Sequence, residues 1–314
     1  MLLAAQQHIP EIYKFCHLSY GNPSCLKFNN HSIISQEGAQ QGDPLGPLLF
    51  CLTVHPILTS LSSKLVVGYL DDITLGGEEQ ALVQDIQQIQ FQGEAMGLKL
   101  NTSKCEFISQ TGPSADAIFT NFIPLRPQDA ILLGAPLCVG TAMDNALTTR
   151  CTELNLAIGR LKDLSAHDAL ILLRASFSAP KILHTLRSSF CVGNPALNQF
   201  DDLLRKGLCD ITNSNLTDLQ WIQASLPVKE GGLGIRRVSS LAPSAFLASA
   251  ASTLNLQDQI LAQCGPCPNS AFNLAGSVWC TIHNLSPPVA PSASKQLVWD
   301  TPDVTEVHFA CQRI

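Results

Sequence analysis

Two acidic residues lie between two short apolar runs in the segment LVVGYLDDITL, residues 65–75. Runs of this length that are rich in β-branched residues favour strands. We therefore expect residues 64–70 and 73–75 to form a hairpin with Asp71 and Asp72 at its tip. Successive strand residues point to opposite faces, so both carboxylates reach one site only if the turn twists them. One of them is then the principal candidate for a metal ligand, and a polar turn without a role is the alternative for this pair alone.

A loop rich in glycine and proline precedes that hairpin, in the segment QQGDPLGP, residues 40–47. Asp43 suits a helix N-cap and Pro44 suits a first helical turn, which predicts a helix to about residue 61 with a kink at Pro56. Glycine lets a ligand approach the backbone closely, and a helix N-terminus favours phosphate. An ordinary strand-to-helix connection explains the same residues.

Taken in order, the two segments resemble a known family. GAQQGDPLGPLLF (residues 38–50) and VVGYLDDITL (residues 66–75) resemble two successive palm motifs of reverse transcriptases carried by retrotransposons without long terminal repeats. GLKLNTSKCEFI (97–108) resembles the fourth motif, and ILLGAPL (131–137) resembles the fifth, the primer grip. Residues 224–249 and WDTP (299–302) are similar to segments that follow the palm in such elements.

The resemblance implies an RNA-directed DNA polymerase with an RNA template, a DNA primer and deoxynucleoside triphosphates as its ligands. Asp71 of the YLDD motif would be the main carboxylate ligand of two Mg²⁺ ions, with Mn²⁺ as an alternative, and Asp72 would be its partner. Divalent metal of this kind activates the attacking hydroxyl and holds the triphosphate in an in-line displacement.

The same resemblance assigns roles around the metal. Tyr69 would support the hairpin near the primer end. Gln41, Gly42 and Pro44 would lie by the nucleotide and the template base. Lys104 would neutralise or protonate the leaving diphosphate. A solvated surface lysine is the alternative reading of Lys104.

The family's first palm motif, a strand that carries another aspartate, has no counterpart in this sequence. Before Asp43, the acidic residues are Glu11, in a predicted helix, and Glu37, in a predicted loop. We therefore expect an N-terminally truncated palm, without fingers, whose metal site is incomplete and whose activity alone is small. The alternative is a catalytically dead remnant that binds nucleic acid or a partner chain.

The expected fold class is α+β. Residues 1–140 are expected to form a partial palm, an antiparallel sheet with packed helices. A mainly helical thumb and connection region is expected over 141–262. The tail, 263–314, is rich in Pro, Ser and Asn and is expected to be irregular.

Local patterns predict individual elements. Residues 4–19 should form a helix, residues 25–34 a hairpin, and residues 78–96 a helix that ends at Gly97. Apolar residues at steps of four and three predict one buried helical face; they are Leu147, Cys151, Leu154, Ile158 and Leu161.

The tail contains the spacing C-x₂-C-x₁₂-C-x₂-H, which is formed by Cys264, Cys267, Cys280 and His283. This spacing suits tetrahedral zinc. Twelve cysteines and eight histidines also give many chance pairings, so unliganded loop cysteines are the favoured interpretation. The Cys264–Cys267 pair lacks the strand-to-helix context of a thioredoxin-like redox site.

Charge limits the class of partner. The net charge is −6, and residues 1–140 hold 6 Lys and Arg against 12 Asp and Glu, which argues against strong autonomous nucleic-acid binding. Residues 150–237 are mildly basic, with 11 basic and 8 acidic residues, and there Arg236 and Arg237 are weak candidates for phosphate contacts.

No apolar stretch is long enough for a membrane span, and the N-terminus does not resemble a signal peptide. Scattered cysteines are then expected to be reduced thiols of an intracellular protein. The sequence leaves nucleus and cytoplasm open.

Overall fold

The computed structural model covers the whole chain and describes every residue except 41, 110–111, 113, 115, 266–268 and 313–314. The chain divides into two compact units. Unit 1 contains residues 1–105, 114–122 and 259–266, and unit 2 contains residues 106–113, 123–258 and 267–314. The chain crosses between the units at residues 105–123 and again on either side of residues 259–266, and the expected palm boundary at residue 140 stays a prediction.

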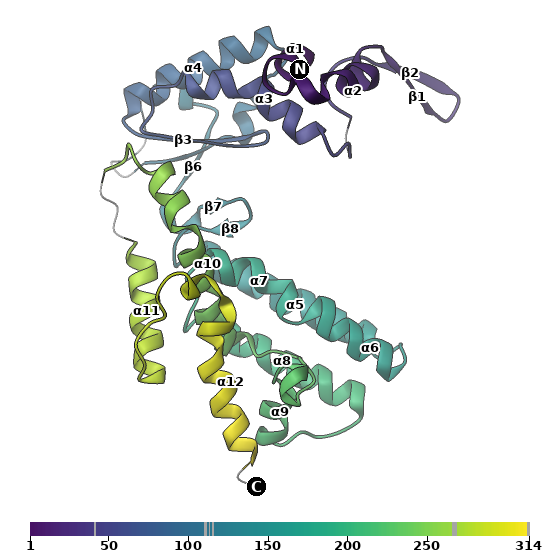
Figure 1. The fold of residues 1–314 in the computed structure, drawn as a ribbon, viewed down its shortest axis with the longest axis vertical. Coiled ribbons are helices and arrows are strands. Elements are labelled where there is room, and N and C mark those ends of the chain that lie inside the picture. The colour runs from purple at the N-terminus through teal and green to yellow at the C-terminus, as the bar shows by residue number, and fades with distance from the viewer. Residues whose placement is uncertain (41, 110–111, 113, 115, 266–268, 313–314) are drawn as a thin grey trace. The chain divides into compact units, whose positions relative to one another are not determined.

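Unit 1 combines helices with two hairpins (Figure 1). In chain order its elements are α1 (Leu2–His8), α2 (Pro10–Tyr20), β1 (Ser24–Phe28), β2 (His31–Ser35), α3 (Gly46–Thr59), β3 (Leu65–Tyr69), β4 (Asp72–Gly76), α4 (Glu79–Ala95) and the 3₁₀ turns Thr102–Lys104 and Ala117–Phe119.

Unit 2 is mainly helical. Its strands are β5 (Glu106–Ile108), β6 (Ile123–Leu125), β7 (Ile131–Leu132) and β8 (Ala135–Pro136), and its α-helices are α5 (Thr141–Leu161), α6 (Ala166–Leu172), α7 (Ala179–Ser188), α8 (Pro195–Thr212), α9 (Asp218–Ala224), α10 (Val238–Ile260), α11 (Ser270–His283) and α12 (Gln296–Gln312). The last two residues of α10 belong to unit 1. One π-turn (Leu173–Phe177) and three 3₁₀ turns (Pro127–Asp129, Val228–Glu230, Ser292–Ser294) complete it.

The α+β class is confirmed, but the strands pair only two by two in the described residues. β1–β2, β3–β4 and β7–β8 are antiparallel, and β5–β6 is parallel. A two-stranded ribbon is marginally stable at best in water, so a packed helix adds to its stability. In unit 1, α3 contacts both α4 and β3, which provides that support for the β3–β4 hairpin.

Several local predictions are confirmed. The hairpin at residues 25–34 forms around Asn29, whose φ of +53° suits asparagine. The helix over 78–96 ends before Gly97, which has a φ of +77°. The five apolar residues predicted for one face of α5 are all buried. They join a core cluster with residues of α7, α8 and α10, among them Phe200 and Leu241.

Other predictions were wrong. The first helix divides at Ile9, because Pro10 lacks an N–H and starts a second helix. Residues 263–314, which we expected to be irregular, contain α11 and α12. These helices bury Trp279 and Trp299 against each other, with ring centroids 5.0 Å apart in an edge-to-face arrangement. The sequence prediction missed these helices because the segment is rich in small polar residues, and only a few aromatic residues form its core.

Candidate functional site

The β3–β4 hairpin carries Asp71 and Asp72 at its tip, but its turn lies one residue earlier than the turn expected at residues 71–72. Tyr69 pairs with Asp72 as the last pair of the ladder, so the turn consists of Leu70 and Asp71. Leu70 has a φ of +56°, a left-handed conformation that costs a residue with a side chain about 1–2 kcal/mol. Strain of this kind persists where the surrounding structure enforces it. The turn therefore takes Asp71 out of the strand alternation that would separate two adjacent strand residues.

Both carboxylates are exposed, and Tyr69 beside them is 57% exposed. Within the described residues no three His, Cys, Asp or Glu side chains gather closely enough to hold a metal ion. Mg²⁺ in proteins commonly takes one or two carboxylates, with water and substrate phosphates as its other ligands. Asp71 and Asp72 therefore have the right oxygen chemistry for Mg²⁺, but they give only part of a two-metal donor set.

Asp85 on α4 anchors the start of the hairpin. Its carboxylate is buried and accepts hydrogen bonds from the backbone N–H groups of Ser62 and Ser63, at 2.9 and 2.7 Å, and from both serine hydroxyls. Burial raises the pKa of Asp85, and these hydrogen bonds outweigh it, so the pKa lies below its ordinary value. Asp85 thereby fixes Ser62 and Ser63, which lie in the connection between α3 and β3.

We did not identify Asp85 from the sequence, although a signal exists. It lies among the apolar residues Leu82, Ile86 and Ile89 at helical spacing. A carboxylate on the apolar side of a helix predicts a buried acceptor with partners. Gly68 adds a second constraint, because a Cβ there would lie 2.5 Å from Cδ1 of Leu58 on α3.

The loop before α3 differs from its prediction. The helix begins at Gly46, with Leu45 as N-cap, so Asp43 is not the cap and Pro44 lies in a turn before the helix. Asp43 instead accepts a hydrogen bond from the Leu45 N–H at 2.9 Å, which closes a local turn that competes with helix formation. Gly42 adopts a φ of +91°, which favours glycine.

Tyr20, the last residue of α2, holds this loop in place. Its hydroxyl donates to the Asp43 carboxylate and accepts from the Gln40 N–H at 3.3 Å. The Tyr20 hydrogen bond, followed by that from Leu45, lowers the pKa of Asp43. Burial, followed by the Asp43 hydrogen bond, raises the pKa of Tyr20. Sequence reasoning missed Tyr20, and Gln41 lies outside the described residues.

Lys104 is exposed at the end of the 3₁₀ turn Thr102–Lys104, in unit 1 with Asp71. Within residues 98–109, Glu106–Ile108 is the only strand, and it pairs in parallel with β6 in unit 2. Asn101 and Ser103 favour a local turn in which the Ser103 hydroxyl donates to the Asn101 side chain at 2.8 Å, so the strand starts later.

In unit 2, α7 and the residue after it hold the β7–β8 hairpin. Leu133 and Gly134 form its turn, both with positive φ. Nε2 of His184 lies 3.1 Å from the Leu133 carbonyl oxygen. Ser189, which is buried, donates its hydroxyl to the Pro136 carbonyl at 2.7 Å. The segment that resembles the primer grip is therefore bonded to α7 and its C-cap residue at two points, its turn and β8.

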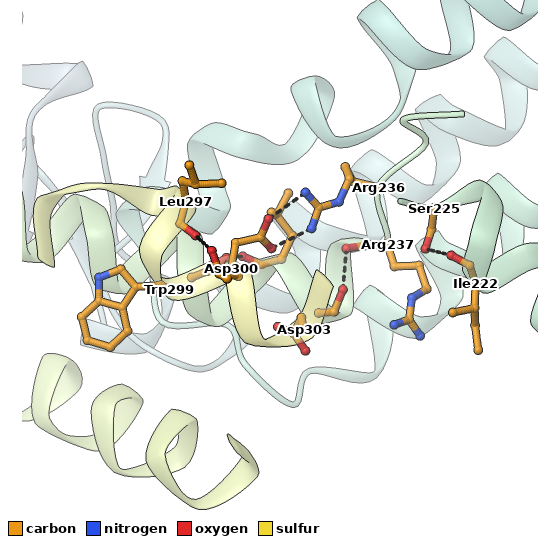
Figure 2. Close-up of polar contacts among 12 residues, drawn as sticks. Ile222, Ser225, Arg236, Arg237, Leu297, Trp299, Asp300 and Asp303 are labelled. Carbon is orange, nitrogen blue, oxygen red and sulfur yellow. Dashed lines mark hydrogen bonds and ion pairs between the residues drawn. The ribbon is translucent and has the colours of Figure 1, made fainter. Parts of the chain in front are cut away.

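Arg236 and Arg237 lie before α10, at the end of residues 226–237, a fully described segment that contains no strand. Arg236 forms a two-point ion pair with Asp300 of α12, at 2.8 and 2.6 Å (Figure 2). Nε of Arg237 is buried without a hydrogen-bond partner among the described residues. The Arg236 guanidinium is thus engaged inside unit 2.

The four residues of the possible zinc site do not form a described cluster. Cys267 lies outside the described residues. Cys280 and His283 are on α11, where the His283 ring packs on Trp279 with centroids 4.9 Å apart, and its Nε2 lies 3.7 Å from Asp303 Oδ2. Burial raises the pKa of the Asp303 carboxyl. The Cys264 thiol, in unit 1, lies 3.6 Å from the Lys64 carbonyl oxygen.

In the described part of the chain, no helix has the length and apolar character of a membrane span.

Two comparisons with known proteins bear on this geometry. The family model described as reverse transcriptase (RNA-dependent DNA polymerase) matches residues 6–135, which contain the Asp43 loop, the β3–β4 hairpin and Lys104. The "Retrotransposable element SLACS 132 kDa protein" of Trypanosoma brucei gambiense is 24% identical over 218 residues. That match covers 68% of this chain and 18% of the relative, so the chain spans less than a fifth of the relative's length.

Proposed function

We propose that the chain is part of an RNA-directed DNA polymerase of a retroelement, because residues 6–135 match the reverse transcriptase family model and the chain is similar to a retrotransposable-element protein. In this proposal, unit 1 supplies part of the palm, and the helices of unit 2 supply the thumb and connection region. RNA template, DNA primer and deoxynucleoside triphosphates are the ligands. The observation that carries the proposal is the strained two-residue turn that displays Asp71 and Asp72 at an exposed hairpin tip, inside the segment that matches the family.

Asp71 would be the principal metal ligand, and Asp72 would lie beside it. Mg²⁺, or Mn²⁺ in its place, would supply charge neutralisation on the triphosphate and would activate the primer hydroxyl. The chain's own contribution is to hold the carboxylates rigidly, and the contacts of Asp85 and Gly68 at the two ends of β3 support that role.

The other residues would act on the nucleotide and the primer. Gly42 and Pro44, with Gln41, would lie by the incoming nucleotide, where a glycine backbone permits close approach. Tyr69 would flank the primer end. Lys104 would neutralise charge on the leaving diphosphate or protonate it, a role that its exposure permits.

A second candidate function is that of a catalytically dead remnant that binds nucleic acid or a partner chain. The observation that favours it is the two-carboxylate donor set, since no third acidic, histidine or cysteine ligand joins Asp71 and Asp72 within the described residues. A polymerase site that lacks one principal ligand loses orders of magnitude in rate. We therefore propose that residues 1–314 alone have little activity.

The test is metal-dependent primer extension on an RNA template. It compares this chain, its Asp71→Asn variant, and a longer version that includes any upstream strand with an aspartate that the gene encodes. We expect extension by the longer version, its loss with Asp71→Asn in that version, and little or none by residues 1–314. Extension by residues 1–314 that Asp71→Asn abolishes would show that another carboxylate completes the site. If no version extends the primer although each is shown to be folded, the catalytically dead remnant is the better explanation.

A further inference from the structure

The β1–β2 hairpin displays large apolar side chains to solvent. Leu26 is 49% exposed, Phe28 68%, Ile33 55% and Ile34 69%. Figure 1 shows the hairpin extending outward from α2 within unit 1. No third strand pairs with it in the described part of the chain. A ribbon with such an apolar surface has the properties of a binding element.

The register puts the aromatic residues of the hairpin on one face at its tip. Phe28 pairs directly with His31, and Leu26 pairs with Ile33 two residues further from the turn. Directly paired residues share a face, so Phe28 and His31 lie on the same face beside the polar Asn29–Asn30 turn. Lys27 is exposed on the other face of the narrow ribbon, paired with Ser32.

The charge around this face is unlike the rest of residues 1–140. Between residues 12 and 36 there is no Asp or Glu, and the segment carries Lys14, His17, Lys27 and His31. All four of these side chains are exposed. No described residue forms an ion pair with Lys14 or Lys27. The β1–β2 hairpin itself carries Lys27 and no acidic residue, so it does not repel phosphate, although the first 140 residues are acidic overall.

We propose that the tip of the β1–β2 hairpin binds single-stranded nucleic acid. Bases stack on Phe28 and His31, and a backbone phosphate lies near Lys27. Exposed aromatic rings combined with nearby cations are the means by which proteins hold single strands without reading their sequence. The inference rests on the proposed function for the origin of the strand, which would be the polymerase template, whereas the binding itself does not require activity.

The test measures the anisotropy of a fluorescein-labelled 20-nucleotide oligouridylate on titration with the full chain at several salt concentrations. We expect Phe28→Ala to weaken binding about 5- to 100-fold, as the loss of one stacking contact does. Phe28→Trp, which keeps a stacking surface, should bind within about twofold of the parent chain. Lys27→Ala should weaken binding and reduce the slope of log K against log salt by about 0.7.

Two matched controls come from the same unit. Phe91 is 79% exposed on α4, a helix that carries acidic residues, so Phe91→Ala makes the same chemical change away from the β1–β2 hairpin. Lys64 pairs with Glu78, so Lys64→Ala removes a lysine whose charge is already balanced. Both variants should bind the oligonucleotide like the parent chain.

Three results would overturn the proposal. One is a folded chain that does not bind the strand at all. Another is binding that Phe28→Ala and Phe91→Ala change equally. The last is an oligomer in sedimentation that Phe28→Ala dissociates without changing strand binding, which would make the face a protein interface. If binding is intact and depends on Phe28 while every version fails in primer extension, the proposed function fails and this inference stands.

Discussion

The guanidinium of Arg236 and the carboxylate of Asp300 meet in a two-point ion pair although 64 residues separate them in the chain. Arg236 follows the glycine turn before α10, and Asp300 follows the buried Trp299 in α12. The indole N–H of Trp279 donates to the Trp299 carbonyl at 2.9 Å, next to this pair. Residues 224–249 and 299–302 each resemble a segment that follows a reverse-transcriptase palm. Through Arg236 and Asp300 these two segments contact each other within unit 2.

Replacing Asp300 with alanine should destabilise unit 2 by about 3 kcal/mol, because Arg236 would keep its charge in a partly buried position without its acceptor. The measurement is chemical denaturation followed by tryptophan fluorescence. Asp218→Ala is the control, since Asp218 pairs with Arg205 but is 88% exposed. That variant should unfold like the parent. Equal effects of the two variants would contradict a structural role for the Arg236–Asp300 pair.

Replacing Asp85 with alanine should cost unit 1 about 2–4 kcal/mol, because two backbone N–H groups and two hydroxyls lose their acceptor at a buried position. Gln88→Ala, on the same helix, removes one exposed hydrogen bond to Ser60 and should have a small effect. The melting temperatures of the two variants distinguish them. A small decrease for Asp85→Ala would show that the Ser62–Ser63 turn is stable without the Asp85 carboxylate.

Asp85 should also confer acid sensitivity. Its folded pKa is lowered, so its contribution to stability is present above the unfolded carboxyl pKa of about 3.9 and is lost as the pH falls through the folded pKa. The free energy of unfolding should therefore fall more steeply in the parent chain than in Asp85→Asn as the pH drops below the unfolded carboxyl pKa of about 3.9. Parallel pH profiles of the two proteins would refute this assignment.

Replacing Leu70 with asparagine should raise the stability of unit 1 by about 1 kcal/mol, because asparagine tolerates a positive φ better than leucine does. Leu98 is the matched control: it is 37% exposed, against 38% for Leu70, and it has no positive φ. Leu98→Asn should leave the melting temperature unchanged or lower it. A lower melting temperature for Leu70→Asn would mean that the leucine side chain contributes more than its strained backbone costs.

Replacing Ser189 with alanine should loosen the β7–β8 hairpin, because the buried Pro136 carbonyl would lose its donor, at a cost of about 1–3 kcal/mol. Ser188→Ala, at the exposed neighbouring position, should be neutral. Hydrogen exchange of residues 131–137 reports on the hairpin directly. Unchanged protection in Ser189→Ala would show that His184 alone secures it.

Features with a local cause were predictable from the sequence. The two-residue turn at Asn29–Asn30, the buried face of α5 and the end of α4 before Gly97 all follow from periodicity and turn chemistry, whereas the turn at Leu70–Asp71 lies one residue before the predicted one. The position of Asp71 and Asp72 at a hairpin tip belongs to this group.

Features set by distant partners were not predictable in this way. Arg236 looked like a surface cation because its partner, Asp300, lies 64 residues away. The start of α3 was misplaced because Asp43 bonds to Tyr20 and to its own loop, a choice that the residue pattern does not encode. The helices of the tail depend on the contact between Trp279 and Trp299 across a segment of small polar residues.

The most direct test of the central claim, that the β3–β4 hairpin is a polymerase metal site, is a Mn²⁺ titration of the isotope-labelled chain followed by NMR. We predict that substoichiometric Mn²⁺ broadens the amide signals of residues 70–73 first, that Mg²⁺ competes, and that Asp71→Asn abolishes the effect. Asp116→Asn, which changes an exposed carboxylate of the same unit that accepts from the Ile118 N–H, should leave the effect intact. Sharp hairpin signals at one equivalent of Mn²⁺, or the same broadening in Asp71→Asn, would contradict the account.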